Sequence, residues 1–142
     1  MEAAPGLADL DICIPSDIQY IAEIVDEVVR RCAVAQFPRR QLALNVPVAL
    51  TEALSNAILR GNGEVVSRSV HVRARFGTEE LVLEVRDEGA GFDLDDCTAD
   101  PTTAENIARE DGRGLFLMRT LMDHVERFSD GGNVVRLTLH RT

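Results

Sequence analysis

The chain has 142 residues, of which 45% are hydrophobic and 27% are charged, and its net charge at pH 7 is −9. This length suits one domain with its own core, and the composition excludes a disordered chain. The acidic balance argues against a nucleic-acid partner, because phosphate backbones are bound through clustered lysine and arginine side chains. It leaves room for a nucleotide, since a small local positive site can hold a triphosphate within an acidic protein.

Targeting signals and metal-type cysteine spacing are not apparent. No uninterrupted apolar run approaches the roughly 18 residues of a membrane span, and the start MEAAPGLADL does not resemble a signal peptide. The three cysteines, Cys13, Cys32 and Cys97, are far apart and are expected to be reduced thiols. We therefore expect a cytoplasmic protein that binds no membrane, with a single domain over residues 1–142.

The first two predicted elements are a strand and a helix. Leu10, Ile12 and Ile14 alternate with polar residues, the period of a half-buried strand. Ser16 followed by Gln19 is a capping-box pattern, and apolar residues then recur at helical spacing. These patterns predict a helix over roughly 17–35.

Two further helical segments follow. The first opens at Phe37, and a restart is expected at Asn45, with asparagine as the cap. Pro47 would then lie in the first turn of the next helix, where its missing N–H costs nothing. This central helix ends at Asn62, within a glycine–asparagine–glycine sequence typical of a C-cap.

The central helix has two faces. One is an apolar stripe that should pack into a core, formed by Leu50, Ala53, Leu54, Ala57 and Ile58. Glu52, Asn56 and Arg60 are spaced four apart and form a second stripe, roughly opposite. A carboxylate, an amide and a guanidinium beside aliphatic neighbours resemble the wall of a pocket. The alternative is a solvated helix face with ordinary i,i+4 pairs.

Three later strands are predicted by alternation. Their apolar positions are Val70, Val72, Ala74 and Phe76, then Leu81, Leu83 and Val85, then Val135, Leu137 and Leu139. The opposite positions are polar and largely basic, namely His71, Arg73, Arg75, Glu84, Arg86, Arg136, Thr138 and His140. One apolar face indicates a sheet covered by helices on one side only. The basic face is either a solvated surface or a partner surface.

Asp87 follows the second of these strands directly, in the sequence VRDEGAGFD. It has the parity of the apolar positions, so it should point toward the helices, where an ionised carboxylate needs hydrogen-bond donors. The exocyclic amine of a purine is one such donor, and Gly89 and Gly91 would let the backbone approach a flat ring. The alternative is a glycine-rich turn in which the aspartate caps local N–H groups.

The segment 93–111 is acidic, lacks an apolar period and is expected to be a functional lid or a disordered insert. Gly112, Arg113 and Gly114 then open a helix, whose free N–H groups and positive dipole end suit an anion. A flexible hinge is the alternative. This last helix is expected to continue through Val125, with His124 at its end, followed by a hairpin that turns at residues 129–132.

The order of these motifs resembles the Bergerat-fold ATP-binding domains shared by gyrase, MutL and histidine kinases. Within them the chain is most similar to the small bacterial anti-sigma factor serine kinases of the RsbW and SpoIIAB type. The resemblance covers about residues 8–141, with TEALSNAI and GRGLFLMRTLMD as its most specific parts. It implies an α+β two-layer sandwich with a mixed, mostly antiparallel sheet and helices on one face.

The resemblance also implies a role for each motif residue. Glu52 matches the catalytic glutamate that orients and deprotonates the attacking hydroxyl, and Asn56 matches the asparagine that holds Mg²⁺. Asp87 matches the adenine-reading aspartate, with Gly89 and Gly91 beside it. The lid glycines that close on the phosphates correspond to Gly112, Arg113 and Gly114. In two places the chain departs from the family: Arg60 stands where many relatives have histidine, and Gly132-Asn133 replaces a glycine–threonine pair.

The function implied is an ATP- and Mg²⁺-dependent protein serine/threonine kinase. It would phosphorylate a STAS-type anti-sigma antagonist, sequester a sigma factor and act as a homodimer. The alternative is a nucleotide-gated binding module of the same fold without kinase activity. A detached histidine-kinase domain fits less well, because none of His71, His124 and His140 lies in a predicted helical hairpin.

Overall fold

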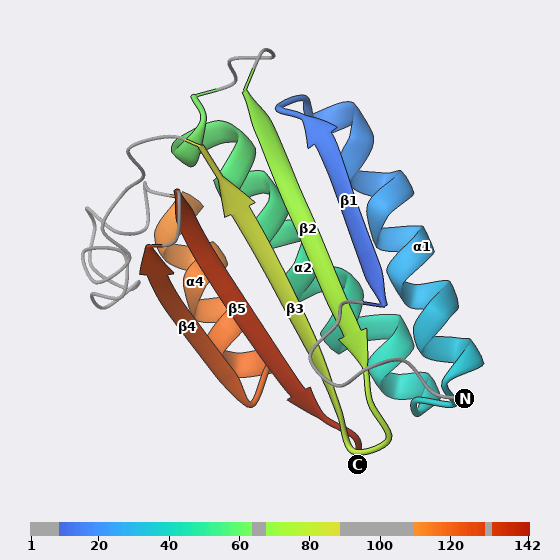
Figure 1. Cartoon of the computed structure of the whole chain (residues 1–142). Helices are drawn as coiled ribbons and strands as arrows, with labels where there is room; N and C mark the ends of the chain where they lie inside the picture. The colour runs from blue at the N-terminus through green and yellow to red at the C-terminus, as the bar shows by residue number, and fades with distance from the viewer. Residues whose placement is uncertain (1–8, 64–67, 89–109, 130–131) are drawn as a thin grey trace.

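A computed structural model of the chain describes residues 9–63, 68–88, 110–129 and 132–142 (Figure 1). The described residues form one five-stranded sheet in the order β1-β2-β3-β5-β4, and every strand pairs antiparallel with its neighbours. The strands are β1 (Leu10–Pro15), β2 (Ser69–Phe76), β3 (Glu80–Asp87), β4 (His124–Ser129) and β5 (Asn133–His140). The expected α+β class is confirmed, and the sheet, expected to be mixed and mostly antiparallel, is antiparallel throughout its described part.

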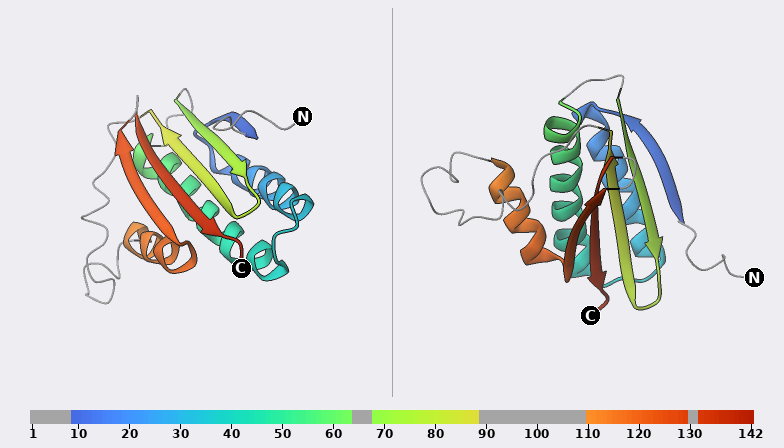
Figure 2. Two further views of the ribbon diagram at one scale, coloured as in Figure 1. Left: turned by 60° about the horizontal axis from the view of Figure 1, so that its bottom comes forward. Right: turned by 60° about the vertical axis from the view of Figure 1, so that its left-hand side comes forward.

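The helices lie on one side of this sheet, as the two turned views show (Figure 2). They are η1 (Ile18–Tyr20), α1 (Ile21–Val34), η2 (Gln41–Asn45), α2 (Val46–Asn56), η3 (Ala57–Gly61) and α4 (Glu110–Leu121). The predicted one-sided cover of the sheet is therefore confirmed. Helices α1 and α2 lie behind the sheet in Figure 1, and α4 lies beside α2 near β4 and β5.

The core lies between these two layers and follows the predicted alternation. Along β3, Leu81, Leu83 and Val85 are buried, while the residues between them are partly exposed. Cross-strand partners continue the pattern, since Val72 faces Val85 and Leu83 faces Leu137 in register. Side chains that share a face of neighbouring strands therefore meet the same helices.

The beginnings of two helices differ from the prediction. Asp17, rather than Ser16, caps η1, because its carboxylate accepts the N–H of Gln19. No restart occurs at Asn45, whose backbone is helical and whose side chain makes no cap hydrogen bond. Its amide nitrogen instead donates to the carbonyl oxygen of Leu121 at 2.7 Å, at the C-terminal end of α4. The side chain of Asn45 therefore bonds to a carbonyl that is distant in the sequence, whereas the local pattern predicted that it caps a helix.

The last helix is shorter than predicted. It ends at Leu121, and His124 and Val125 lie in β4, not in the helix. The N–H of Asp123 already donates to the carbonyl oxygen of Thr138 at 2.8 Å, so pairing with β5 begins there. The helical spacing of apolar residues continues by chance to Val125, but hydrogen bonding to β5 makes this segment a strand. The predicted hairpin is confirmed by the pairing of β4 with β5.

Residues Gln41–Leu59 form a 19-residue helical segment that is long and apolar enough to cross a membrane, by length and composition alone. Counting uninterrupted apolar runs in the sequence did not detect it. In the structure this segment packs against the sheet, and Leu50 and Leu54 are fully buried there. Burial in the core accounts for its apolar composition.

Candidate nucleotide-binding site

Helix α2 presents the predicted polar stripe at its C-terminal half. Its apolar stripe is buried in the core, which fixes the rotation of the helix about its axis. Glu52 on the other side is half-buried, whereas Asn56 is only 7% exposed. The Nδ2 atom of Asn56 is buried and has no hydrogen-bond partner among the described residues. A buried amide without a partner is costly, so it points to a ligand at this position.

Asp87 ends β3 and is 4% exposed, facing the helix layer as its parity predicted. Its partner in register on β5 is Asn133, which is also buried. The Nδ2 atom of Asn133 is a second buried donor without a partner in the described part of the chain. The asparagine that replaces the family's usual threonine thus lies directly opposite the predicted adenine-reading aspartate.

Asn56, Asp87 and Asn133 line one small hollow together with Ala53, Ala57, Arg127 and Val135. The structure therefore brings together the helix amide and the strand carboxylate, which are 31 positions apart in the sequence. The hollow has a volume of about 10 Å³, which is room for about one water molecule. An adenine ring is larger, so a nucleotide can enter only if a wall moves. Arg127 is the exposed residue of this lining.

The first turns of α4 press against α2 at Glu52. A Cβ atom added to Gly114 would overlap the Oε1 atom of Glu52 and lie 3.8 Å from the Nδ2 atom of Asn56. Glycine at 114 is therefore what allows this approach. Gly114 is the fifth residue of α4, so this contact lies one turn after the N–H groups at the start of the helix that have no intrahelical acceptor. The carboxylate of Glu52, the amide of Asn56 and the second turn of α4 meet at this point.

Several predicted site residues cannot be placed in this geometry. Gly89 and Gly91 lie outside the described residues, as does most of the expected lid. Helix α4 begins at Glu110, so the last two residues of the segment 93–111, which was expected to be a lid, lie in a helix. Gly112 and Arg113 lie inside α4, while Arg60 lies in η3, and the side chains of Arg60 and Arg113 are outside the description.

Sequence reasoning missed Arg127 as a site residue. It lies in β4 and lines the hollow, but the sequence analysis assigned no role to the residues between the last helix and the hairpin turn. The sequence does contain a sign of its position. Arg127 lies two residues before the predicted turn, and a hairpin with that turn pairs it with Val135. If β4 had been recognised as a strand, Arg127 would have been placed beside Val135 and Asn133 of β5, which line the same hollow.

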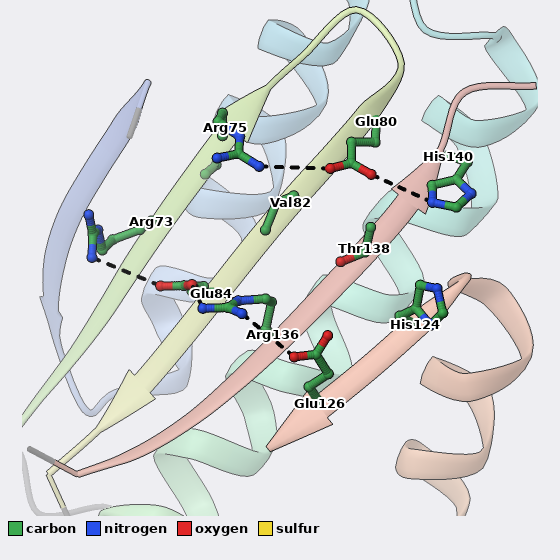
Figure 3. A pocket seen from close by; sticks show the side chains of 11 residues that line it. Arg73, Arg75, Glu80, Val82, Glu84, His124, Glu126, Arg136, Thr138 and His140 are labelled. Atoms are coloured by element: carbon green, nitrogen blue, oxygen red, sulfur yellow. Dashed lines mark hydrogen bonds and ion pairs between the residues drawn. The ribbon is translucent and has the colours of Figure 1, made fainter. Parts of the chain in front are cut away.

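A second, wider hollow of about 590 Å³ lies on the face of the sheet opposite the described helices, and Figure 3 shows the side chains that line it. Its charges are paired across strands. Glu84 binds Arg136 at 2.8 Å and approaches Arg73 at 4.0 Å, and Glu80 lies 3.7 Å from Arg75. The arginines predicted to make this face basic therefore have acidic neighbours on the sheet itself. This hollow lies on the opposite face from the first and is not part of the candidate site.

Elsewhere on that face, a histidine links two charged groups. The Nε2 atom of His71 contacts a carboxylate oxygen of Asp11, and Arg86 bonds the other ring nitrogen at 2.7 Å. The hydrogen bond from His71 lowers the pKa of Asp11, and the charges of His71, Arg73 and Arg86 add to this effect. These contacts tie β1 to β2 and β3 without reaching the first hollow.

Comparison with known proteins agrees with this geometry. The family model described as "Histidine kinase-like ATPase domain" matches residues 14–139. The chain is 26% identical to the Anti-sigma F factor of Clostridium beijerinckii over 131 residues, covering 87% of this chain and 91% of that protein. It is 29% identical to the Anti-sigma F factor of Clostridium kluyveri over 132 residues, with coverage of 87% and 91%. It is 32% identical to the Serine-protein kinase RsbW of Bacillus velezensis over 99 residues, covering 66% of this chain and 62% of that protein. The chain belongs to the family of histidine kinase-like ATPase domains.

Proposed function

We propose that this protein is an ATP-dependent protein serine kinase of the anti-sigma type. The observation that best supports this is the meeting of Asn56 and Asp87 at one hollow, beside the contact of Gly114 with Glu52. The names of the relatives, anti-sigma F factor and serine-protein kinase, agree with an ATP-binding anti-sigma kinase. The match to an ATPase domain family supports the binding of ATP. The identity of the protein partners is an additional part of the proposal.

Asp87 would recognise the adenine. Its carboxylate lies at the end of β3 and is 4% exposed, so a hydrogen bond from a purine amine that reaches it would be shielded from water. A hydrogen bond to a charged acceptor contributes about 1.5–3 kcal/mol. Asn133 lies across the same hollow and brings a buried amide to the same ring. Gly89 and Gly91, which follow β3, would form the rest of this side of the pocket.

Asn56 would hold Mg²⁺. Its amide is buried without a partner for Nδ2, and a rotation of the amide by half a turn would present its oxygen instead. The described residues contain no group of three or more acidic, histidine or cysteine side chains that could hold a metal by themselves. A single protein oxygen fits a Mg²⁺ ion that takes its other ligands from phosphates and water. When bound, the ion neutralises charge that develops on the phosphates.

Glu52 would act on the hydroxyl of the protein substrate. It is half-buried and lies against the first turns of α4, whose free N–H groups suit phosphate oxygens. A hydroxyl approaching a phosphate held at that helix end would therefore come within reach of the carboxylate. Glu52 would orient this hydroxyl and accept its proton. Gly112, Arg113 and Gly114 would close on the phosphates, and Arg60 would lie on the same polar stripe as a phosphate contact.

The proposed protein substrate is a STAS-type anti-sigma antagonist, and the proposed sequestered partner is a sigma factor. We also propose that the protein works as a homodimer in the cytoplasm. The names of the relatives support the sigma factor, and the antagonist and the homodimer rest on the family resemblance alone. The competing proposal is a nucleotide-gated binding module, which would hold and release a partner without transferring phosphate.

Two measurements test the proposal. ATP with Mg²⁺ should raise the melting temperature, as any specific ligand of the folded state does, and Asp87→Asn should abolish this rise. The γ-phosphate of labelled ATP should transfer to a co-purified partner with the wild type, and Glu52→Gln should transfer little or none. Equal labelling by both proteins would remove Glu52 from the role of base. Partner release without a labelled product would favour the binding module.

A further inference from the structure

Asn62 is the most highly connected buried amide in the described part of the chain. The sequence marks it only as part of a glycine-rich helix end, yet its side chain has no solvent exposure. Its amide nitrogen donates to the Oγ atom of Ser16 at 2.7 Å and to the carbonyl oxygen of Ser69 at 2.9 Å. Its amide oxygen accepts the backbone N–H of Glu88 at 2.8 Å. One side chain thus joins the ends of three segments: the end of β1, the start of β2 and the end of β3.

The π-helical turn η3 explains why this side chain points inward. The N–H of Asn62 donates to the carbonyl oxygen of Ala57 at 2.9 Å, five residues earlier, instead of four. In this wider turn Asn62 stays near the buried Ala57, to which its N–H is bonded, and its own side chain is buried. A regular α-helical turn would have brought Gly61, which has no side chain, to that place. The extra residue of the turn therefore delivers an amide to the end of β3.

The hydrogen bond from Glu88 matters because of the residue that precedes it. The accepted N–H belongs to the peptide unit whose carbonyl is that of Asp87. On the other side of that unit lies Gly132, where an added Cβ atom would overlap the Asp87 carbonyl oxygen. The peptide is therefore held on its N–H side by Asn62 and packed closely on its oxygen side by Gly132. Its plane sets the direction in which the Asp87 side chain leaves the strand.

Asn62 directly follows η3, the end of the continuous helical segment that carries Asn56 six positions earlier. Figure 1 shows the end of β3 beside the end of this segment. The hydrogen bond to Glu88 therefore connects the helix that presents Asn56 to the strand that presents Asp87. It fixes the separation of the two groups that line the hollow. This hydrogen bond is directional, whereas the apolar packing between α2 and the sheet is not.

We infer that Asn62 is a positioning residue that orients Asp87 for base recognition. It touches neither base nor phosphate in this role, and it acts through the peptide unit between Asp87 and Glu88. The inference rests on the proposed function, because it takes Asp87 as the group that reads adenine. Its consequence is specific: loss of the amide should damage discrimination between purine bases more than it damages affinity for the triphosphate.

The test compares dissociation constants for ATP and GTP, each with Mg²⁺, using the full chain and a fluorescence or calorimetric titration. We expect Asn62→Ala to lower the ratio of the GTP to the ATP constant by about tenfold, the size of one misplaced hydrogen bond to a charged group. Asn62→Asp keeps an oxygen that accepts the Glu88 N–H and should retain most of the ratio. Ser16→Ala removes only the partner on β1 and should leave the ratio within about twofold of wild type.

Asn45→Ala is the matched control, since it also removes an amide that donates to a backbone carbonyl, that of Leu121, away from Asp87. It should lower the melting temperature without changing the ratio. An unchanged ratio in folded Asn62→Ala would overturn the inference, and so would an equal loss in Asn45→Ala. Asp87→Asn separates the two proposals. If Asp87→Asn leaves the ratio unchanged, the adenine assignment fails; if it lowers the ratio and Asn62→Ala does not, only the role of Asn62 fails.

Discussion

Replacing Gly114 with alanine should stabilise the fold and at the same time damage phosphoryl transfer. The reason lies in one contact: the new Cβ atom would overlap Oε1 of Glu52, the end of a half-buried side chain that can rotate away. The rest of the surroundings leaves room, since the next neighbours lie at 3.4 Å and 3.8 Å. The substitution therefore displaces the carboxylate rather than the helix.

The two effects have different sizes. Alanine in place of glycine inside a helix gains about 0.5–1 kcal/mol, because glycine loses more backbone freedom on folding. In a domain of this length that corresponds to a rise of about 2–4 °C in melting temperature. Displacing a catalytic group by about 1 Å can cost about 100-fold in rate. We therefore expect a more stable protein with a kcat reduced by about two orders of magnitude.

The assay combines thermal unfolding with γ-phosphate transfer, measured for wild type, Gly114→Ala, Glu52→Gln and the double variant. If the alanine acts through Glu52, the double variant should be no slower than Glu52→Gln alone, since coupled residues are not additive. Wild-type turnover by Gly114→Ala would refute the reasoning. A loss of stability of more than about 1 kcal/mol would refute it as well, because it would show that Glu52 cannot move aside.

Three further predictions concern other parts of the fold. Gly132→Ala should destabilise the protein by at least about 2 kcal/mol in urea unfolding, because Gly132 has a φ of +148° and the new Cβ would meet the rigid backbone oxygen of Asp87; a wild-type midpoint would contradict this. Burial raises the pKa of Cys32 from 9.0 to about 12, so its share of the stability is complete below pH 9.0 and is lost as the pH rises toward 12. Between pH 8 and pH 10.5 the urea midpoint should therefore fall more for wild type than for Cys32→Val, which has no buried thiol to ionise. Hydrogen bonds from Arg30 and then from the next arginine lower the pKa of Glu27 from 4.5 to about 2, so its stabilising effect is present above pH 4.5 and lost as the pH falls toward 2. Between pH 6 and pH 3 the melting temperature should fall less for Glu27→Gln than for wild type. Equal falls would contradict a stabilising role of the ion pairs of Glu27.

Much of the candidate site could be predicted because it depends on local periodicity. Asp87 continues the parity of β3, so its inward direction follows from the alternation of three apolar residues before it. Asn56 and the apolar stripe of α2 follow in the same way from helical spacing. In both cases the direction of the side chain follows from its neighbours in the same helix or strand, and these neighbours can be read from the sequence.

The remaining features depend on partners that are distant in the chain. Asn45 and Asn62 both looked like helix-end residues, but their amides bond to Leu121, Ser16, Ser69 and Glu88. Likewise, β4 became a strand because β5 offered it hydrogen-bond partners. A polar side chain or a short apolar segment has several local solutions of similar energy, and long-range contacts choose among them.

By itself, the sequence determined the two layers of the protein, the inward direction of Asp87 and the polar stripe that contains Glu52 and Asn56, because each is set by a repeating pattern over neighbouring residues. Only the tertiary structure decided that Asn56 and Asp87 share one hollow, that Gly114 lies against Glu52 and that Asn62 holds the end of β3. These are contacts between separate elements. They depend on how a helix and a sheet pack together, and no local pattern specifies that distance.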